Sequence, residues 1–164
     1  MLMHVSRRSL LLTAAAALTT STSLTPDQRL RVGLLTFVLP AGASPGTVPA
    51  GWDWAATGEQ GMEIAIRGRS AAPTPELALA TALRPDAAGT VRYSVTGTPP
   101  QGVSGADAYR VWSVRSTSEP VRTGVLLAAT LDRETAVCLV TGSQGWSPSL
   151  RRSFLSSIEV RHEA

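Results

Sequence analysis

Residues 121–141 read VRTGVLLAATL-DRE-TAVCLVT, two apolar runs joined by three polar residues. Each run has the aliphatic and β-branched composition that is typical of a strand. The polar loop Asp132–Glu134 is short enough for a hairpin, so the two runs are predicted to be adjacent antiparallel strands. This hairpin favours an antiparallel sheet as the frame of the fold.

Five further segments carry strand patterns on either side of the hairpin. The clearest is 62–66, in which Met62, Ile64 and Ile66 share one face, opposite Glu63 and Arg67. The others are 34–39, 90–96, 108–114 and the closing 158–162. The Gly/Pro/Ser-rich stretch 41–51 has no periodicity and is predicted to be a loop.

Two helices are predicted, each beginning at a proline. The first starts at Thr74-Pro75-Glu76, with a capping hydroxyl, Pro at the first helical position and a carboxylate in the positive first turn, and it runs to about Leu83. Ser147-Pro148 repeats this chemistry and starts the second helix, which places Leu150 and Phe154 on one apolar face.

This order of elements predicts an α+β fold, a mostly antiparallel β-sheet of about six strands flanked by helices. The predicted domain is 34–164, preceded by a polar and irregular stretch, 24–33, that is expected to be a flexible leader. About 140 residues after the first 23 suit a single domain.

The first 23 residues carry the pattern of an export signal. Arg7 and Arg8 form a charged n-region, 9–18 form a short apolar core, and 19–23 supply small polar residues for cleavage after Ser23. Paired arginines favour the twin-arginine route, and a Leu where that pattern usually has Phe leaves a Sec-type signal open. The core is half of the roughly 20 residues that a membrane span needs. We therefore expect an extracytoplasmic protein, secreted or in the cell envelope, with no stable membrane span after cleavage.

The charge balance excludes several function classes. All 15 basic residues are arginines, and removal of Arg7 and Arg8 would leave 13 of them against 12 acidic residues. A nearly neutral chain does not indicate nucleic-acid binding. The chain has no Lys and no Asn, so it has no lysine Schiff base, no phosphate-loop lysine and no Asn-linked glycan.

Nucleophilic catalysis has few candidate residues. His4 leaves with the signal, so His162 is the remaining imidazole. Ser143 lies between a predicted strand and a predicted helix, as a nucleophile elbow requires, but Thr141 stands where the first glycine of that motif belongs. Ser104 lacks the second glycine. A small secreted serine hydrolase using Ser143 with His162 is the alternative function.

Metal and cofactor chemistry is not indicated. Cys138 is the single cysteine, so it is expected to be a buried, inert thiol without a disulfide. One Cys and one His do not make a zinc site. The carboxylates Asp53, Glu59 and Glu63 are expected on the solvated surface, and not as an acid/base pair. The sequence predicts no catalytic site, no metal and no cofactor.

Aromatic residues are the candidates for a binding surface. Trp52 and Trp54 are two residues apart, so they would point the same way in an extended segment. One reading makes them a lid on the core. The other makes one of them, together with Trp146 or Tyr109, an exposed aromatic patch for a partner, so the candidate surface residues are Trp52, Trp54, Tyr109 and Trp146.

Several short phrases, in this order, resemble the PsbP/Mog1-like superfamily. They are a first strand ending at Pro40 and leading to Gly51-Trp52, the Pro75-initiated helix, Gly105-x-x-Ala108-Tyr109-Arg110, the long hairpin, and Phe154-Leu155-x-Ser157-Ile158-x-Val160. The long insertion 41–51 departs from the usual direct step from strand to Gly-Trp. The resemblance implies an α-β-α sandwich and transfers no functional residues.

The resemblance also implies a module without catalytic activity that binds a larger partner. Known members are extrinsic subunits of photosystem II, a Ran-binding nuclear import factor and exported bacterial proteins. The expected function is an exported, non-enzymatic binding or assembly module. Its expected partner is another envelope or extracellular protein, or a glycan or lipid, and not a nucleic acid.

The export route can be tested by fusing residues 1–30 to a reporter that must fold before it is exported. We expect export that is lost when Arg7 and Arg8 are both changed to Lys, because the twin-arginine machinery reads the arginine pair. Export is measured as reporter activity outside the cytoplasm. Export that is unaffected by the double change would indicate the Sec route.

Overall fold

The computed structural model describes residues 28–85, 89 and 91–162. The predicted export signal 1–23, with Arg7, Arg8 and His4, lies outside the described residues, as does Thr90. The strands are β1 (Arg29–Val32), β2 (Leu35–Val38), β3 (Ser44–Pro45), β4 (Trp54–Thr57), β5 (Glu63–Ser70), β6 (Tyr93–Gly97), β7 (Ala108–Ser116), β8 (Arg122–Leu131), β9 (Glu134–Ser143) and β10 (Glu159–Val160). The helices are α1 (Pro75–Ala82) and α2 (Pro148–Ser157), with a 3-10 turn at Glu59–Gly61.

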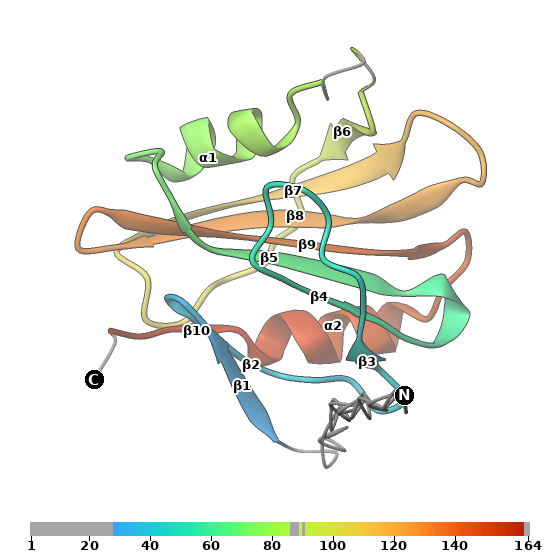
Figure 1. Ribbon diagram of the computed structural model, residues 1–164, viewed down its shortest axis with the longest axis horizontal. Coiled ribbons are helices and arrows are strands. Elements are labelled where there is room, and N and C mark those ends of the chain that lie inside the picture. Colours follow the sequence, from blue (N-terminus) through green and yellow to red (C-terminus); the bar gives the residue numbers. More distant parts are fainter. Residues whose placement is uncertain (1–27, 86–88, 90, 163–164) are drawn as a thin grey trace, which may run out of the picture.

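Two antiparallel sheets and two α-helices make up the described part of the chain. The large sheet has the strand order β3-β4-β5-β9-β8-β7-β6, and the small sheet has the order β1-β2-β10. Figure 1 shows α1 above and α2 below the strands of the large sheet, with the small sheet on the side of α2. The coarse prediction, a mostly antiparallel α+β fold, is confirmed. The strands form sheets of seven and three, not one sheet of about six.

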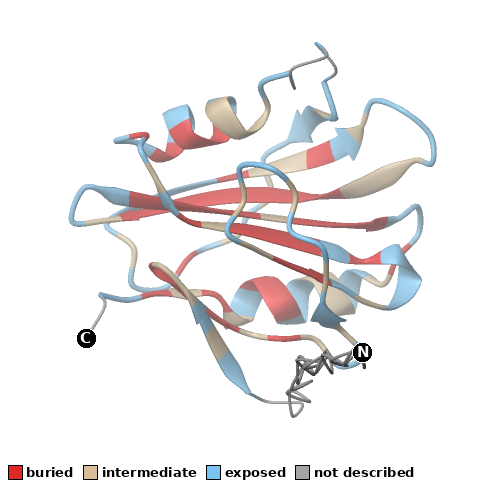
Figure 2. Cartoon of the chain, in the orientation of Figure 1, coloured by how far each residue is buried: buried red, intermediate tan, exposed pale blue. Residues whose placement is uncertain are grey.

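The hairpin of β8 and β9 lies at the centre of the large sheet. Its two ten-residue strands pair from Arg122 with Ser143 to Leu131 with Glu134. Asp132 and Arg133 make the two-residue turn, and both have positive φ, as the tight turns of twisted hairpins require. Figure 2 shows these central strands as largely buried. The sequence prediction of an antiparallel hairpin is confirmed.

Alternation along the central strands creates two cores. Val125, Leu127 and Cys138 point to one face, where they pack with β2 and α2 in what we call the α2-side core. Leu126 and Val137 point to the other face and pack under α1 in the α1-side core. Because side chains alternate with a period of two, one hairpin supplies both cores.

Both predicted helix starts are confirmed. Thr74 Oγ1 accepts a hydrogen bond from Leu77 N at 3.3 Å, with Pro75 at the first helical position. Ser147 Oγ accepts one from Leu150 N at 3.4 Å. These caps satisfy backbone donors that have no partner within the helix.

The prediction of a flexible leader over 24–33 is wrong for its described part. Arg29–Val32 form β1, which pairs with β2 in antiparallel register. Leu30 and Val32 pack against the α2-side core. Arg29 forms an ion pair with Glu159 of β10 at 3.1 Å. Tertiary partners override the weak local pattern of this segment.

The turn between β1 and β2 packs directly on the large sheet. Gly33 has φ +56°, and a Cβ on Gly68 would lie 2.8 Å from Gly33 N. Leu34 N donates to Gly68 O at 3.2 Å. Glycine on both sides lets the two backbones touch at this point.

The sequence did not predict strands β3 and β4. β3 lies within the predicted loop 41–51, and β4 follows that loop. Trp54–Thr57 pairs with β5 through four residues, but its Trp-Ala-Ala-Thr sequence has no polar and apolar alternation to reveal it. Ser44–Pro45 pairs with β4 for two residues only. Pairing with β5 therefore decides β4, and pairing with β4 decides β3.

Burial raises the pKa of the Cys138 thiol to about 12 from an ordinary value of 9.0. We expect Cys138 to stay unlabelled by an aromatic disulfide reagent at pH 8 in the folded protein and to react fully in denaturant, since the thiolate is the reactive form. Absorbance of the released thiol measures this. Stoichiometric labelling without denaturant would contradict the assigned burial.

The same pKa shift makes stability depend on pH. Below pH 9 the thiol is neutral in both states and contributes no pH dependence. From pH 9 towards 12 the unfolded chain loses the proton while the folded chain keeps it, so the free energy of unfolding falls by up to about 1.4 kcal/mol per pH unit. Urea titrations from pH 8 to 10.5 should show this slope in the wild type and a shallower one in Cys138→Ala. Equal slopes would contradict it.

Candidate binding groove beside helix α1

Helix α1 is too small to cover its face of the large sheet. Its eight residues make a cylinder about 12 Å long and about 10 Å wide, whereas seven strands make a sheet about 29 Å wide. Its main contacts are with β7, β8 and β9. The face over β4 and β5 is left to the loop that precedes β4, which rises across the sheet towards α1 (Figure 1).

A groove of about 570 Å³ lies between this loop, the end of α1 and the sheet. Ala55, Ala65 and Leu139 are the apolar part of its floor, from β4, β5 and β9. Trp52 of the loop and Leu83 after α1 add apolar walls. The alanine side chains are small and leave space above the sheet. The groove therefore exists because β4 and β5 carry small residues on the side that faces α1.

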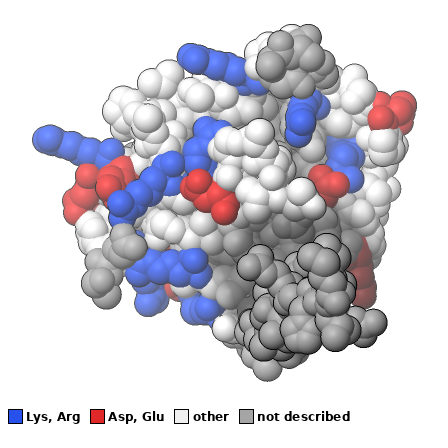
Figure 3. Space-filling view, in the orientation of Figure 1, with Lys and Arg blue, Asp and Glu red and all other residues white. Residues whose placement is uncertain are grey.

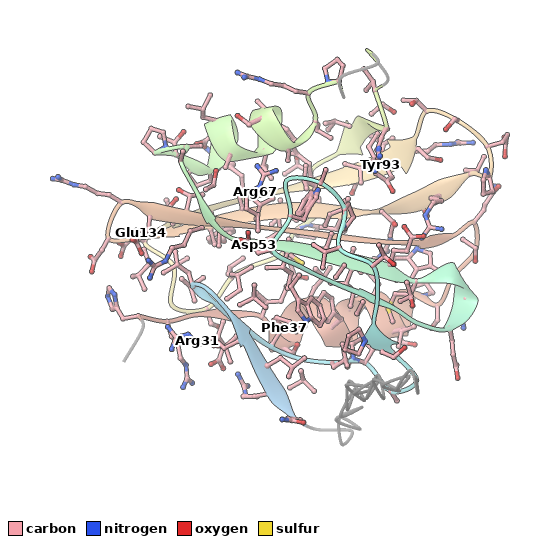
Figure 4. The ribbon with its side chains drawn as sticks, in the orientation of Figure 1. Arg31, Phe37, Asp53, Arg67, Tyr93 and Glu134 are labelled. Atoms are coloured by element: carbon pink, nitrogen blue, oxygen red, sulfur yellow. The ribbon has the colours of Figure 1, made fainter. Side chains whose placement is uncertain are left out.

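Arg67 of β5 is held in a defined position in the groove. Its Nε donates to Gly51 O at 2.7 Å, and its guanidinium lies 5.3 Å from the centroid of the Trp52 ring. A hydrogen bond and a cation–π contact thus restrain the planar group. Figure 4 shows Arg67 beside the loop on the α1 side of β5, and Phe37 on the α2 side.

Asp53 fastens the same loop to β5. Its Oδ2 accepts a hydrogen bond from Gly68 N at 2.7 Å, and its backbone N donates to Ile66 O at 2.9 Å. The loop is therefore attached to β5 by Asp53 as well as by Arg67. Asp53 is exposed, as the sequence predicted, and its carboxylate also has this structural role.

The groove carries more positive than negative charge. Arg67, Arg84 and Arg92 line it, against Glu63 as the carboxylate. Glu63 is paired with Arg122, whose Nη1 lies 3.3 Å from Glu63 Oε1. Within 28–85, 89 and 91–162, no carboxylate is paired with Arg67, Arg84 or Arg92. Figure 3 shows arginines spread over the face turned to the viewer, with carboxylates between them.

A smaller hollow of about 350 Å³ continues from the groove. Arg92 and Tyr93 line both spaces, and the hollow reaches Arg122 and Ser116. The Arg122 guanidinium is already engaged, because its Nη2 donates to Gly61 O and to Thr141 Oγ1. Arg92 is shared by the two spaces, whereas Arg67 and Arg84 line the larger groove.

The structure does not bring the four candidate aromatics together. Trp52 borders the groove and packs on the α1-side core, whereas Trp54 packs on the α2-side core, with its ring 5.2 Å from that of Phe37. The expectation that they point the same way is wrong, because β4 begins at Trp54 and Trp52 lies in the loop before it. Only Trp54 follows the alternation of the strand.

The remaining two aromatics lie on the α2 side of the sheet. Trp146 is 5% exposed and belongs to the α2-side core. It packs on Gly142, where a Cβ would overlap the indole ring. Tyr109 is 43% exposed and pairs with Ala129, whose side chain also faces the α2-side core. Of the four aromatics, Trp52 alone lines the groove.

Ser143 and His162 lie far apart. Ser143 ends β9, and its Oγ donates to Gln60 O at 2.7 Å. His162 Nε2 lies 2.9 Å from Asp132 Oδ2, at the hairpin turn before β9. Ten strand residues separate these ends, which is about 30 Å. The carbonyl oxygen of Ser104 accepts a hydrogen bond from Val160 N at 2.9 Å, next to β10.

Neither a metal site nor a membrane-spanning helix is found in the described part of the chain. No group of three or more His, Cys, Asp or Glu side chains within 28–85, 89 and 91–162 is arranged to hold a metal ion. In the same residues, no helix is both long and apolar enough to cross a membrane. Glu63 is exposed, as the sequence predicted.

The arginines of the groove are the functional candidates that sequence reasoning missed. Glu63, Ala65 and Arg67 form the other face of the strand that the sequence predicted best, and a polar face normally indicates solvent. Arg84 and Arg92 follow α1 and precede β6 without any motif. The chain matches no known protein-family model and no curated protein.

The different positions of Trp52 and Trp54 predict different costs of truncation. Trp54→Ala should lower the free energy of unfolding by about 3 kcal/mol, because it opens the core beside Phe37. Trp52→Ala should lower it by about 1 kcal/mol, since it removes a wall of the groove and the contact with Arg67. Urea unfolding measures both. Equal losses would contradict the assigned positions.

Proposed function

We propose that this chain is an exported, non-enzymatic binding or assembly module of the PsbP/Mog1-like superfamily, acting in the cell envelope or outside the cell. The observation that carries the proposal is the groove of about 570 Å³ beside α1. Its volume falls within the range of about 300–1,000 Å³ that is typical of ligand sites. Its lining combines an apolar floor with a few polar groups, as binding sites commonly do.

The arrangement of the layers supports membership of the superfamily. Helix α1 packs on part of one face of the large sheet, and α2 with the small sheet packs on the other face. This agrees with the α-β-α sandwich that the sequence resemblance implies. The insertion 41–51, which departs from the family pattern, supplies β3 and part of the groove wall, including Pro49 and Ala50.

The position of the first strand is compatible with export. β1 begins at Arg29, and the predicted cleavage follows Ser23, so five residues separate the two. Cleavage there would leave every described strand intact. The chain after cleavage would carry the whole groove to the far side of the membrane.

Geometry favours binding over the serine hydrolase alternative. The separation of Ser143 from His162 by the length of β9 leaves the serine without that base. The Ser143 hydroxyl instead donates to Gln60 O and holds the turn Glu59–Gly61 against the end of β9. This hydrogen bond gives Ser143 a structural role.

The proposal is tested by filling the groove. Ala65→Leu adds bulk to the floor, whereas Ser156→Leu adds the same side chain to an exposed position on α2, outside the groove. Chains from Leu24 onward are immobilised and exposed to an envelope extract, and retained proteins, glycans and lipids are identified by mass spectrometry. We expect a component that is retained by the wild type and by Ser156→Leu, reduced at least tenfold by Ala65→Leu, and recovered chemically unchanged.

Two results would contradict the proposal. Equal retention by Ala65→Leu and the wild type would show that the groove is not the binding site. Recovery of the partner in a cleaved or modified form would show that the chain is an enzyme. Circular dichroism of both variants controls for folding, because a leucine on a floor of small residues can strain the strand.

A further inference from the structure

We infer that the groove binds a single-chain amphiphile with an oxyanion head, a carboxylate or a phosphate monoester. The inference rests on the proposed function and adds the chemistry of the ligand. The inference rests on two observations about the groove. Its three arginines have no paired carboxylate among the described residues, and its floor is apolar.

Arg67 is arranged as a receptor for an oxyanion. The hydrogen bond to Gly51 O uses Nε, at 2.7 Å, and the Trp52 ring supports the guanidinium plane. No hydrogen bond within the described part of the chain engages the Nη groups. Two parallel N–H donors on one restrained plane match the two oxygens of a carboxylate or phosphate.

Arg84 and Arg92 add positive charge without fixing the geometry. Both are exposed side chains that line the same groove. Arg84 follows α1 and Arg92 precedes β6, so the two enter the groove from the side opposite to Trp52 and its loop. Their charges are complementary to an anion and unfavourable for a cation.

The apolar floor of the groove favours a ligand with an alkyl chain. Ala55, Ala65 and Leu139 present methyl groups from three adjacent strands, and Trp52 and Leu83 flank them. An alkyl chain over this surface would bury apolar area on both sides, which is favourable at about 25 cal/mol per Å². A fully polar anion would leave this floor uncovered.

Isothermal titration calorimetry on the chain from Leu24 onward tests the inference with decyl probes below their micelle concentrations. We expect decanoate and decyl phosphate to bind, and their relative affinities assign the head group. Decyltrimethylammonium and decyl maltoside should bind at least tenfold more weakly, because each lacks the anion. Acetate should not bind measurably, because it lacks the chain. Raising the salt concentration should weaken binding of the anionic probes.

Variants locate the head group. Arg67→Met keeps an aliphatic stem in the groove but removes the guanidinium group. It should weaken decanoate binding roughly tenfold, the size expected for a lost charge-assisted hydrogen bond. The double variant Arg84→Gln with Arg92→Gln should weaken it about threefold without changing the thermal midpoint, since these side chains pair with no described carboxylate. Arg152→Gln removes the same charge from an exposed position on α2 and should have no effect.

Several results would overturn the inference. They are equal binding of the cationic and anionic probes, unchanged decanoate affinity in both arginine variants, and binding of an acidic hexapeptide in place of the decyl compounds. The proposed function can survive each of these. It fails only if Ala65→Leu keeps the envelope component or if that component is recovered chemically changed, so the two failures are distinguishable.

Discussion

The fold depends on burying both faces of the β8–β9 hairpin. Val125, Leu127 and Cys138 point to one side and Leu126 and Val137 to the other, and all five are almost fully buried. A strand pair that is apolar on both faces cannot lie at a surface, because either face left open would expose a large apolar area. The chain therefore places a cover on each side, α2 with the small sheet on one and α1 on the other.

The unequal size of these covers produces the groove. On the α2 side, β2 brings Leu35 and Phe37 to meet Phe154, and the packing is continuous. On the α1 side, eight residues of helix leave β4 and β5 to a loop. That loop is held at a distance from α1 by its attachments to β5, through Asp53 and Arg67. The groove and its charge thus arise from the contacts that support the loop.

Local patterns predicted the central elements because their causes are local. The Asp132–Glu134 turn between two apolar runs, the Thr74 and Ser147 caps, and the alternation of Met62, Ile64 and Ile66 each act over a few residues, and the corresponding elements are found. β1 and β4 were missed because long-range pairing stabilises them. Trp52 and Trp54 lie on different sides of the sheet for the same reason. The pairing of β4 with β5 begins at Trp54 and fixes the face to which its side chain points, whereas Trp52 lies in the loop before the strand.

The sequence by itself determined the antiparallel frame, the two helix starts, the solitary buried thiol and the absence of any lysine chemistry. Only the tertiary structure decided that the face carrying Ala65 and Arg67 is half covered, that Trp52 and Gly51 restrain Arg67, and that Ser143 and His162 lie at opposite ends of β9. The physical reason is one of range. Turns, helix caps and side-chain alternation depend on neighbouring residues. How much of a sheet a helix covers depends on the pairing of strands that are distant in the chain.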